Sequence, residues 1–446
     1  MPTAARRQAV VASSDPTVRD TVLKLSTLKL PRARARRVPE TAPTLRAARG
    51  CAAAASPGVP MAVLGAARSD QDGGATMAAH DRHPTAAKTM KCVLVERHGG
   101  RDDFEEIIRV AEAWPQPTRG RGQLLLRVQA CSLAPGDVRT MSGATRFVQT
   151  PASGFPYVPG GDVVGLVEEP DPECTTFRKG DCVIARFSDA PSGGLGEYHA
   201  VSTSLAALKP RGMSTAEAAA LPASVVVAVI TVERWLTPGD RVLVLGATGG
   251  VGSHAVQLLK SGGASFVAAV ARIPECLAAR DVDRVINYTQ ENWWEVSEFQ
   301  GGNQFDLILD FAAFPDAWAN CGAVLKSGNE GGRFVTTAGD SPYFPVRGCW
   351  DVLVLMKNIF WRKLWTSCSC VTSAPRYSWF LGGLVDPIMA DTWASMFQAI
   401  DDGGLRVILD SAGPFPFTEA GVKDAFRLQE SRHAHGKVVI LIDSTA

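Results

Sequence analysis

The sequence predicts an α/β protein: a β-rich section followed by a doubly wound parallel sheet, preceded by a disordered leader. Three observations support this prediction. Short β-branched segments separated by Gly, Pro and Asp dominate residues 90–213, and apolar strands alternate with helical patterns over residues 214–411. Residues 1–89 show neither pattern, and residues 412–446 read as a helix and then a strand.

Composition bounds the class of protein. The 446 residues allow two or more domains, and 46% apolar with 20% charged residues is ordinary for a globular protein. A net charge of +1 gives no reason to expect a nucleic-acid partner, and no apolar run is long enough to predict a transmembrane helix. The ten cysteines form no CxxC pair, which favours reduced thiols over a disulfide framework.

The leader is basic. Residues 1–60 hold eleven Lys and Arg against three Asp and Glu, a net charge of +8, and they lack the apolar core of a secretory signal. This composition is typical of an organelle transit peptide for a mitochondrion or a plastid. The alternatives are a disordered leader, or an upstream start that is not used, on a cytoplasmic protein.

The β-rich section contains five strand-like segments, each bounded by turn residues. They are Lys91–Glu96, Gly122–Leu133, Val163–Glu169, Gly180–Phe187 and Gly193–Pro210. A helix over Ser214–Trp235 then leads into further strands at Arg241–Gly246, Ser265–Ala271, Asp283–Thr289, Phe305–Ala313 and Gly331–Gly339. Strands that alternate with helical segments predict βαβ units and a parallel sheet.

A glycine-rich turn follows the strand at Arg241–Gly246 and opens a helix. Three of its glycines are spaced three apart, against the two-then-three spacing of the usual dinucleotide fingerprint. Glycine lets the backbone approach a pyrophosphate, and a helix N-terminus favours its negative charge. We therefore expect the turn to bind a dinucleotide through Gly246, Ala247, Thr248, Gly249, Gly250, Val251 and Gly252.

The residue after the next strand predicts which dinucleotide binds. An NAD site offers an acid there to the ribose 2′-hydroxyl, whereas this chain has Arg272. A guanidinium pairs with a 2′-phosphate, so NADPH is the expected cofactor. Glu275 lies close by and keeps NADH open as an alternative.

The order of several motifs resembles one family. From Met90 to Asp443, "PYVPGGDVVGLVEE", "AAALPAS", "GDRVLVLGATGGVGSHAVQL", "DRVINYT" and "HAHGKVVI" are similar to the medium-chain dehydrogenase/reductase family, in its zinc-free quinone oxidoreductase and enoyl-reductase-domain branch. "PRYSWF" and "SRHAHGKVVI" resemble organelle members related to the reticulon-interacting mitochondrial oxidoreductase. The resemblance implies a GroES-like catalytic domain over 90–213, a Rossmann domain over 214–411, and a return to the catalytic domain over 412–446.

The resemblance also implies roles for single residues. Arg272 and Tyr288 match positions around the cofactor's 2′-phosphate, and Lys437 matches a position near its adenosine end. Each has a plainer alternative: Arg272 as an ordinary surface charge, Tyr288 as a packing residue, and Lys437 as a solvated lysine on a strand edge. Asp137 and Tyr157 are the catalytic candidates. Each has an alternative: Asp137 also suits a helix N-cap, and Tyr157 lies in "FPYVPG", which looks like a structural loop.

Departures from the family pattern concern metal and catalysis. The ligand cysteine of zinc members falls at Ala134 and their ligand histidine at Gly161, while Cys131 is displaced by three residues, so we expect no metal. Ala134 also replaces an amide usually near the nicotinamide, and Val227 replaces a threonine. These changes point to an altered substrate or weakened catalysis.

The stretch Gly348–Trp365 combines three tryptophans with many aliphatic residues and basic neighbours. It predicts a core helix or a subunit interface first, then a lid over an apolar substrate channel, and finally an interfacial membrane contact.

Together these features predict an NADPH-dependent, metal-free reductase of a quinone or another small apolar conjugated carbonyl, with a homodimer and peripheral membrane contact open. Two alternatives stand beside it: an enoyl-thioester reductase, and an NADPH-binding interaction protein whose catalysis has decayed.

Overall fold

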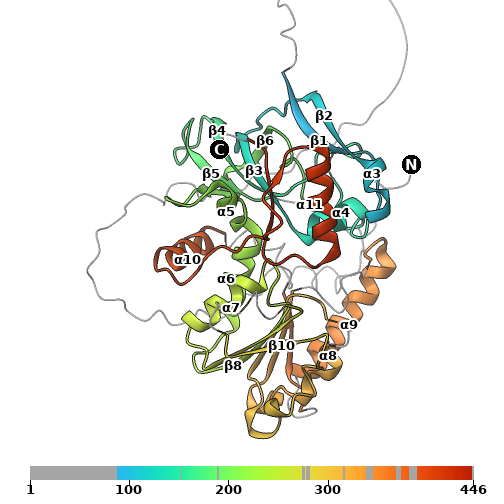
Figure 1. The fold of residues 1–446 in the computed structure, drawn as a ribbon, viewed down its shortest axis with the longest axis vertical. Coiled ribbons are helices and arrows are strands. Elements are labelled where there is room, and N and C mark those ends of the chain that lie inside the picture. Colours follow the sequence, from blue (N-terminus) through green and yellow to red (C-terminus); the bar gives the residue numbers. More distant parts are fainter. Residues whose placement is uncertain are drawn as a thin grey trace, which may run out of the picture. The chain divides into compact units, whose positions relative to one another are not determined.

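The computed structural model describes residues 88–443 except for 152, 188–189, 274–276, 278–281, 315–316, 338–344, 368–372 and 381–388. The predicted leader, residues 1–89, therefore lies outside the described residues except for its last two. Glu275 lies outside them as well. Two large sheets carry the described fold, one of seven strands and one of six (Figure 1). The predicted α/β fold class is confirmed.

The seven-stranded sheet joins segments from both ends of the described chain. Its strands are β3 (Gln123–Leu133), β4 (Asp162–Glu169), β5 (Cys182–Ala185), β6 (Tyr198–Ser202), β7 (Ala206–Leu208), β14 (Phe415–Pro416) and β15 (Val438–Leu441). β15 pairs antiparallel with β3, which places Ile440 opposite Cys131. The last strand thus brings the chain back beside the first large strand.

Smaller elements complete this layer. They are the antiparallel pair β1 (Thr89–Val95) and β2 (Ile108–Pro115), and the helices α3 (Phe104–Ile107), α4 (Pro135–Ser142) and α11 (Glu419–Ser431). Phe104 of α3 and Phe426 of α11 meet edge to face in the same apolar core, which fixes α11 against the N-terminal strands.

The six-stranded sheet is parallel throughout. Its order is β10 (Arg284–Asn287), β9 (Phe266–Ala271), β8 (Arg241–Leu245), β11 (Leu307–Asp310), β12 (Arg333–Thr336) and β13 (Arg376–Trp379). Val242 and Val244 belong to one core and Leu243 and Leu245 to another, because successive strand residues point to opposite faces. This apolar pattern on both faces is typical of a sheet covered by helices on each side.

The covering helices divide accordingly. On the face of Val242 lie α6 (Val226–Trp235), α7 (Gly252–Ser261) and α10 (Met389–Asp401), and on the other lie α8 (Ala317–Asn320) and α9 (Cys349–Ser367). Short 3₁₀ turns occur at Arg101–Asp103, Thr203–Leu205, Ser297–Phe299, Gly301–Asn303, Cys321–Ala323 and Gly328–Glu330. Among the described residues, no helix has the length and apolarity needed to cross a membrane.

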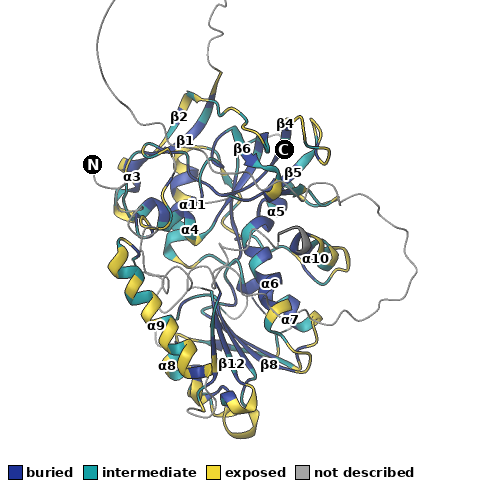
Figure 2. Ribbon diagram, turned by 180° about the vertical axis from the view of Figure 1, so that it is seen from behind, coloured by how far each residue is buried: buried dark blue, intermediate teal, exposed yellow. Residues whose placement is uncertain are grey.

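Two of the differences from the sequence prediction concern helices. The helix expected over Ser214–Trp235 is interrupted: α5 (Thr215–Ala219) and α6 are separated by a π-helical turn over Leu221–Val225. Pro222 lies in that turn, and proline removes an N–H and crowds the preceding helical turn. The stretch at Gly348 is a helix, α9, but not a core helix, because one long face of it is exposed (Figure 2).

Candidate functional site

The glycine turn joins β8 to α7, and its glycines have different structural reasons. Gly246 has a φ of +78°, and a Cβ there would lie 2.7 Å from the Cβ of Ala312. A Cβ on Gly252 would lie 2.2 Å from the carbonyl oxygen of Gly246. Packing therefore requires glycine at both positions. At Gly249, a Cβ would meet only that carbonyl oxygen, at an ordinary 3.5 Å.

Packing within the described residues thus leaves Gly249 unexplained. A ligand would explain it, because the missing side chain leaves the main chain bare just before α7. The first amide groups of a helix and its dipole favour an anion at this position.

Two later segments of the chain hold the turn in place. The Gly436 N–H donates to the Thr248 carbonyl at 2.9 Å, and Gly436 pairs with Gly249 in a parallel bridge. The next residue, Lys437, donates its N–H to the Ile408 carbonyl at 2.9 Å. The turn, the strand-like segment at 408 and the segment at 436 therefore form one hydrogen-bonded unit.

His254 of α7 links the same three parts from the helix side. Its Nδ1 lies 2.6 Å from the Gly250 carbonyl, and the Ile408 N–H donates to its Nε2 at 3.1 Å. A carbonyl only accepts and a main-chain amide only donates, so His254 is neutral with its proton on Nδ1. It fixes the orientation of the peptide that follows Gly250.

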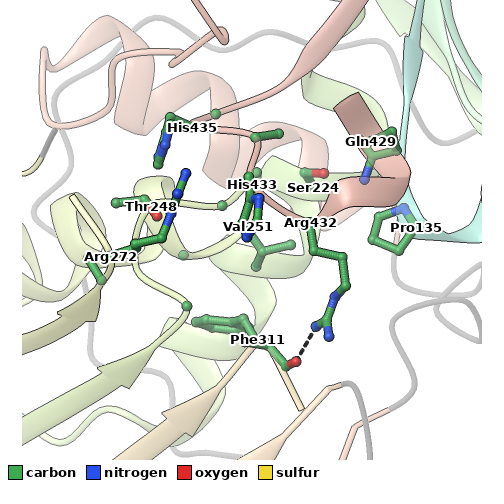
Figure 3. A pocket seen from close by; sticks show the side chains of 18 of the residues that line it. Pro135, Ser224, Thr248, Val251, Arg272, Phe311, Gln429, Arg432, His433 and His435 are labelled. Atoms are coloured by element: carbon green, nitrogen blue, oxygen red, sulfur yellow. Dashed lines mark hydrogen bonds between the residues drawn. The ribbon is translucent and has the colours of Figure 1, made fainter. Parts of the chain in front are cut away.

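A pocket of about 390 Å³ lies beside this unit (Figure 3). One wall comes from the end of β3 and the start of α4, at Leu133, Ala134 and Pro135. The opposite wall comes from the ends of β8 and β9. Further lining residues are Ser224, Tyr288, Phe311, Ala312, Ala313, Phe314, Gln429, Ser431, Arg432, His433, Ala434, His435, Gly436 and Lys437.

Arg272 follows β9 and lines this pocket. Its Nε is buried and has no hydrogen-bond partner among the described residues. A buried donor without a partner is costly, and an anionic ligand in the pocket would satisfy it. Tyr288 lines the same pocket, with its ring edge-on to Phe314 at 5.1 Å between centroids. The structure thus brings Arg272 and Tyr288 to one pocket.

Lys437 also lines the pocket, but its ammonium points to the seven-stranded sheet. Nζ donates to the Leu133 carbonyl at 2.9 Å and lies 3.7 Å from the carboxylate of Asp162. The alternative of a solvated strand-edge lysine is wrong, because the side chain is only 2% exposed. A Cβ on Gly250 would lie 3.0 Å from its Cδ, so Lys437 sits beneath the turn. Its contacts are with β3 and β4, whereas Arg272 follows β9.

The two weak catalytic candidates are buried, and neither is among the side chains that line the pocket. A carboxylate oxygen of Asp137 accepts the Ala134 N–H at 2.8 Å at the start of α4, and burial raises its pKa to about 7. Burial also raises the pKa of Tyr157, whose hydroxyl has no hydrogen-bond partner among the described residues. Asp162 belongs to the same buried group, and burial raises its pKa although Lys437 lowers it.

Arg432 and Ser224 are among the lining residues that sequence reasoning missed. The Arg432 guanidinium donates to the Ala312 carbonyl across the pocket (Figure 3). Arg432 and Ala313 both have positive φ angles, +60° and +49°, which are uncommon outside glycine. Ser224 enters through the π-helical turn at Pro222, so a regular helical period did not reveal it.

No three His, Cys, Asp or Glu side chains within the described part of the chain are arranged to hold a metal ion. At the position of the family's ligand histidine, a Cβ on Gly161 would lie 2.4 Å from the ring of Phe187. A larger side chain there would displace that ring. Cys131 is fully buried, and burial raises the pKa of its thiol well above the ordinary value.

Family profiles match both halves of the described chain. Residues 120–234 match the alcohol dehydrogenase GroES-like domain, and residues 280–440 match the zinc-binding dehydrogenase profile. The spinach quinone-oxidoreductase homolog (chloroplastic) is 32% identical over 240 residues, which cover 51% of this chain and 70% of that protein. The chain belongs to the medium-chain dehydrogenase/reductase family. The predicted resemblance is confirmed.

Other relatives of this dehydrogenase/reductase are organelle proteins. The NADPH-dependent alkenal/one oxidoreductase (chloroplastic) of Arabidopsis thaliana is 29% identical, with 79% of this chain and 80% of that protein covered. The mitochondrial NAD(P)H oxidoreductase RTN4IP1 of Mus musculus is 28% identical, with 71% and 81% covered. The Escherichia coli quinone oxidoreductase complexed with NADPH shares the fold: its TM-score is 0.60 at 20% identity, over 79% of this chain and 99% of that one.

The residues of the pocket fit a dinucleotide. The bare main chain at Gly249 suits a pyrophosphate. The Nε of Arg272, which lacks a partner within the part of the chain that the structure describes, suits a further phosphate. The pocket lies where β8 feeds the first helix of a parallel sheet, the usual place for such a ligand.

Proposed function

We propose that this chain is an NADPH-dependent reductase that transfers hydride, without a metal, to a quinone or another conjugated carbonyl. The observation that carries the proposal is the pocket in which the bare turn at Gly249 lies together with Arg272, whose Nε has no hydrogen-bond partner among the described residues. The names of the relatives support it, since one is an NADPH-dependent alkenal/one oxidoreductase and another a quinone-oxidoreductase homolog.

In this proposal the chain binds the cofactor through three parts. The main chain of the glycine turn holds the pyrophosphate, while Arg272 and Tyr288 hold the 2′-phosphate. Lys437 supplies positive charge beneath the turn, on the side of β3, rather than at the adenosine end. When bound, the nicotinamide supplies the hydride, and the protein positions the acceptor carbon against it.

The acceptor end of the pocket is mainly apolar. Leu133, Ala134, Pro135 and Phe311 line it, which suits a small apolar acceptor. Because this wall provides little side-chain acidity, we assign the proton that completes the reduction to water. Asp137 and Tyr157 remain weak proton-donor predictions. Positioning and exclusion of bulk water then supply most of the rate.

The relatives do not favour the alternatives of an enoyl-thioester reductase or a decayed interaction protein. Their chloroplast and mitochondrial names support an organelle location, and within that we propose the basic leader as the transit peptide. A homodimer stays a prediction, and so do the domain boundaries at 89, 213 and 411.

Activity assays test the proposal. Loss of NADPH absorbance, and separately of NADH, would be followed with quinones, alkenals and enoyl thioesters in the presence of a chelator. We expect turnover of alkenals or quinones with NADPH that the chelator does not change. Tight NADPH binding without turnover of any acceptor would overturn the reductase and leave the interaction protein. Absence of NADPH binding would overturn the site itself.

A further inference from the structure

Helix α9 exposes one long face to solvent (Figure 2), and large apolar side chains lie along it. Seven large apolar side chains on it are between 43% and 72% exposed, and we call them the aromatic ridge. They are Trp350, Leu353, Met356, Phe360, Trp361, Leu364 and Trp365. Spacings of three, four and seven residues place most of them along one side of the helix. Seven exposed large apolar side chains gathered on one helix mark an interaction site.

The opposite side of α9 anchors the helix and fixes which way the ridge faces. The Tyr377 N–H in β13 donates to the Thr366 hydroxyl at 3.3 Å. The Arg362 guanidinium lies 5.4 Å from the ring centroid of Tyr377, and Ile359 packs against the core beneath. The ridge is therefore the outer face of a docked helix rather than an unplaced segment.

The apolar surface continues beyond the helix. The Phe147 N–H donates to the Val346 carbonyl at 3.1 Å, and the Val346 N–H donates to the Ala144 carbonyl at 2.6 Å. These bonds hold the loop that carries Phe147 and Val148 beside the start of α9. Both side chains are exposed, by 46% and 61%.

The charges around the ridge are basic. Exposed Lys357 lies within it, Lys363 lies at its side, and exposed Arg347 precedes the helix. The single acid of α9, Asp351, accepts the N–H groups of Arg347 and Gly348 at the helix start. An apolar face with basic neighbours is complementary to an anionic lipid surface, where aromatic rings sit among the headgroups.

A second copy of the chain suits this face less well. Two-fold antiparallel pairing of α9 about its midpoint brings Lys357 against its own copy inside an apolar contact. A lysine at a lipid surface instead extends its ammonium to the headgroups while its stem lies along the apolar face.

We infer that the aromatic ridge docks this protein on an anionic lipid surface, with α9 lying in the plane of the headgroups. Its 19 residues give a contact about 28 Å long. The inference goes beyond the proposed reductase function and does not depend on it. If that function also holds, the docked protein meets apolar acceptors where they concentrate.

Vesicle binding tests the inference with the full chain, so that the basic leader is the same in every sample. Cosedimentation would use phosphatidylcholine vesicles with and without phosphatidylglycerol. The triple variant Phe360→Ser, Trp361→Ser and Leu364→Ser removes the middle of the ridge. We expect its partition onto mixed vesicles to fall at least about tenfold. The control Leu208→Ser removes an apolar side chain that is 51% exposed on β7, away from α9, and should partition like the wild type.

Two further measurements distinguish a lipid surface from a second copy of the chain as the partner of the aromatic ridge. Lipids brominated at the upper acyl chain should quench wild-type tryptophan fluorescence more than that of the triple variant. Lys357→Glu with Lys363→Glu should weaken binding to the anionic vesicles by about fivefold or more per charge, and leave binding to neutral vesicles nearly unchanged. Circular dichroism and thermal unfolding would show that the variants remain folded.

Equal partition of the wild type and the triple variant would overturn the inference, because the leader would then account for binding. Lack of wild-type binding, with a dimer in sedimentation that the triple variant abolishes, would assign the ridge to a second copy. Reductase activity on a water-soluble acceptor is a separate readout, so a failed reductase proposal leaves the vesicle result unaffected.

Discussion

Replacing Gly249 with valine separates cofactor binding from folding. A Cβ at this position meets only the Gly246 carbonyl oxygen, at 3.5 Å, so we expect the unfolding free energy to change by less than about 1 kcal/mol. The side chain would occupy the space in which a pyrophosphate approaches the main chain. Losing two hydrogen bonds to a charged group costs at least about 3 kcal/mol, or more than about 100-fold in Kd for NADPH.

Titration of NADPH by fluorescence, together with denaturant unfolding of the cofactor-free protein, measures both quantities. Gly252→Ala is the matched comparison, because its Cβ would lie 2.2 Å from the Gly246 carbonyl oxygen. That variant should lose stability by about 1–3 kcal/mol, as overpacked sites do. Wild-type affinity in a folded Gly249→Val protein would refute the assignment of this turn to the cofactor.

Three further variants test other parts of the site. Arg272→Asp should raise the KM for NADPH by about 10- to 150-fold, because charge-assisted hydrogen bonds are lost, and should favour NADH. If the ratio of kcat/KM for NADPH to that for NADH were unchanged in steady-state kinetics, Arg272 would not belong to the site. Burial raises the pKa of Asp137 from 3.8 to about 7, so between these pH values the folded state keeps a proton that the unfolded state releases. The unfolding free energy therefore falls by about 4 kcal/mol as the pH rises from 3.8 to 7. Asp137→Asn should reduce this fall in unfolding free energy between pH 4 and pH 8, while Asp162 and Asp310, whose pKa values burial also raises, keep the remainder, and kcat should be unchanged. A large loss of kcat with an altered pH profile would instead make Asp137 catalytic. Arg432→Gly should speed NADPH release severalfold in stopped flow, because it removes the hydrogen bond to the Ala312 carbonyl across the pocket; an unchanged release rate would show that this bond does not retain the cofactor. Relief of the positive φ at this position should offset the loss of folding stability by about 1–2 kcal/mol.

Much of the fold was predictable because the buried strands are short apolar runs between turn residues. The strand expected at Arg241–Gly246 is β8, which ends at Leu245 before the positive φ of Gly246. Strand β13 was missed because none of its four residues is β-branched, whereas the predicted edge strand β10 contains Val285 and Ile286. The π-helical turn at Pro222 was also missed, since a continuous apolar pattern does not reveal where hydrogen bonding changes register.

The site was predictable only where one local segment builds it. The glycine turn and Arg272 lie within a single βαβ unit, so motif and spacing were enough to bring them together. Lys437 needed the pairing of β15 with β3, a contact between segments about 300 residues apart. Arg432 follows α11, whereas Ala312 follows β11 in the other sheet, so no local sequence pattern predicts the hydrogen bond between them.

The departures from the family pattern affect the pocket unequally. Val227 is partly buried, packs against the core and is not among the side chains that line the pocket. The absence of a threonine hydroxyl at this position therefore leaves the lining of the pocket unchanged. Ala134 does line the pocket, and its own N–H is already used by Asp137. The acceptor wall has therefore lost a polar side chain without gaining a main-chain donor. A reductase built on such a wall depends on where it holds the acceptor carbon, and its proton comes from solvent. For that reason its kcat should change little across the titration of Asp137, although its stability changes.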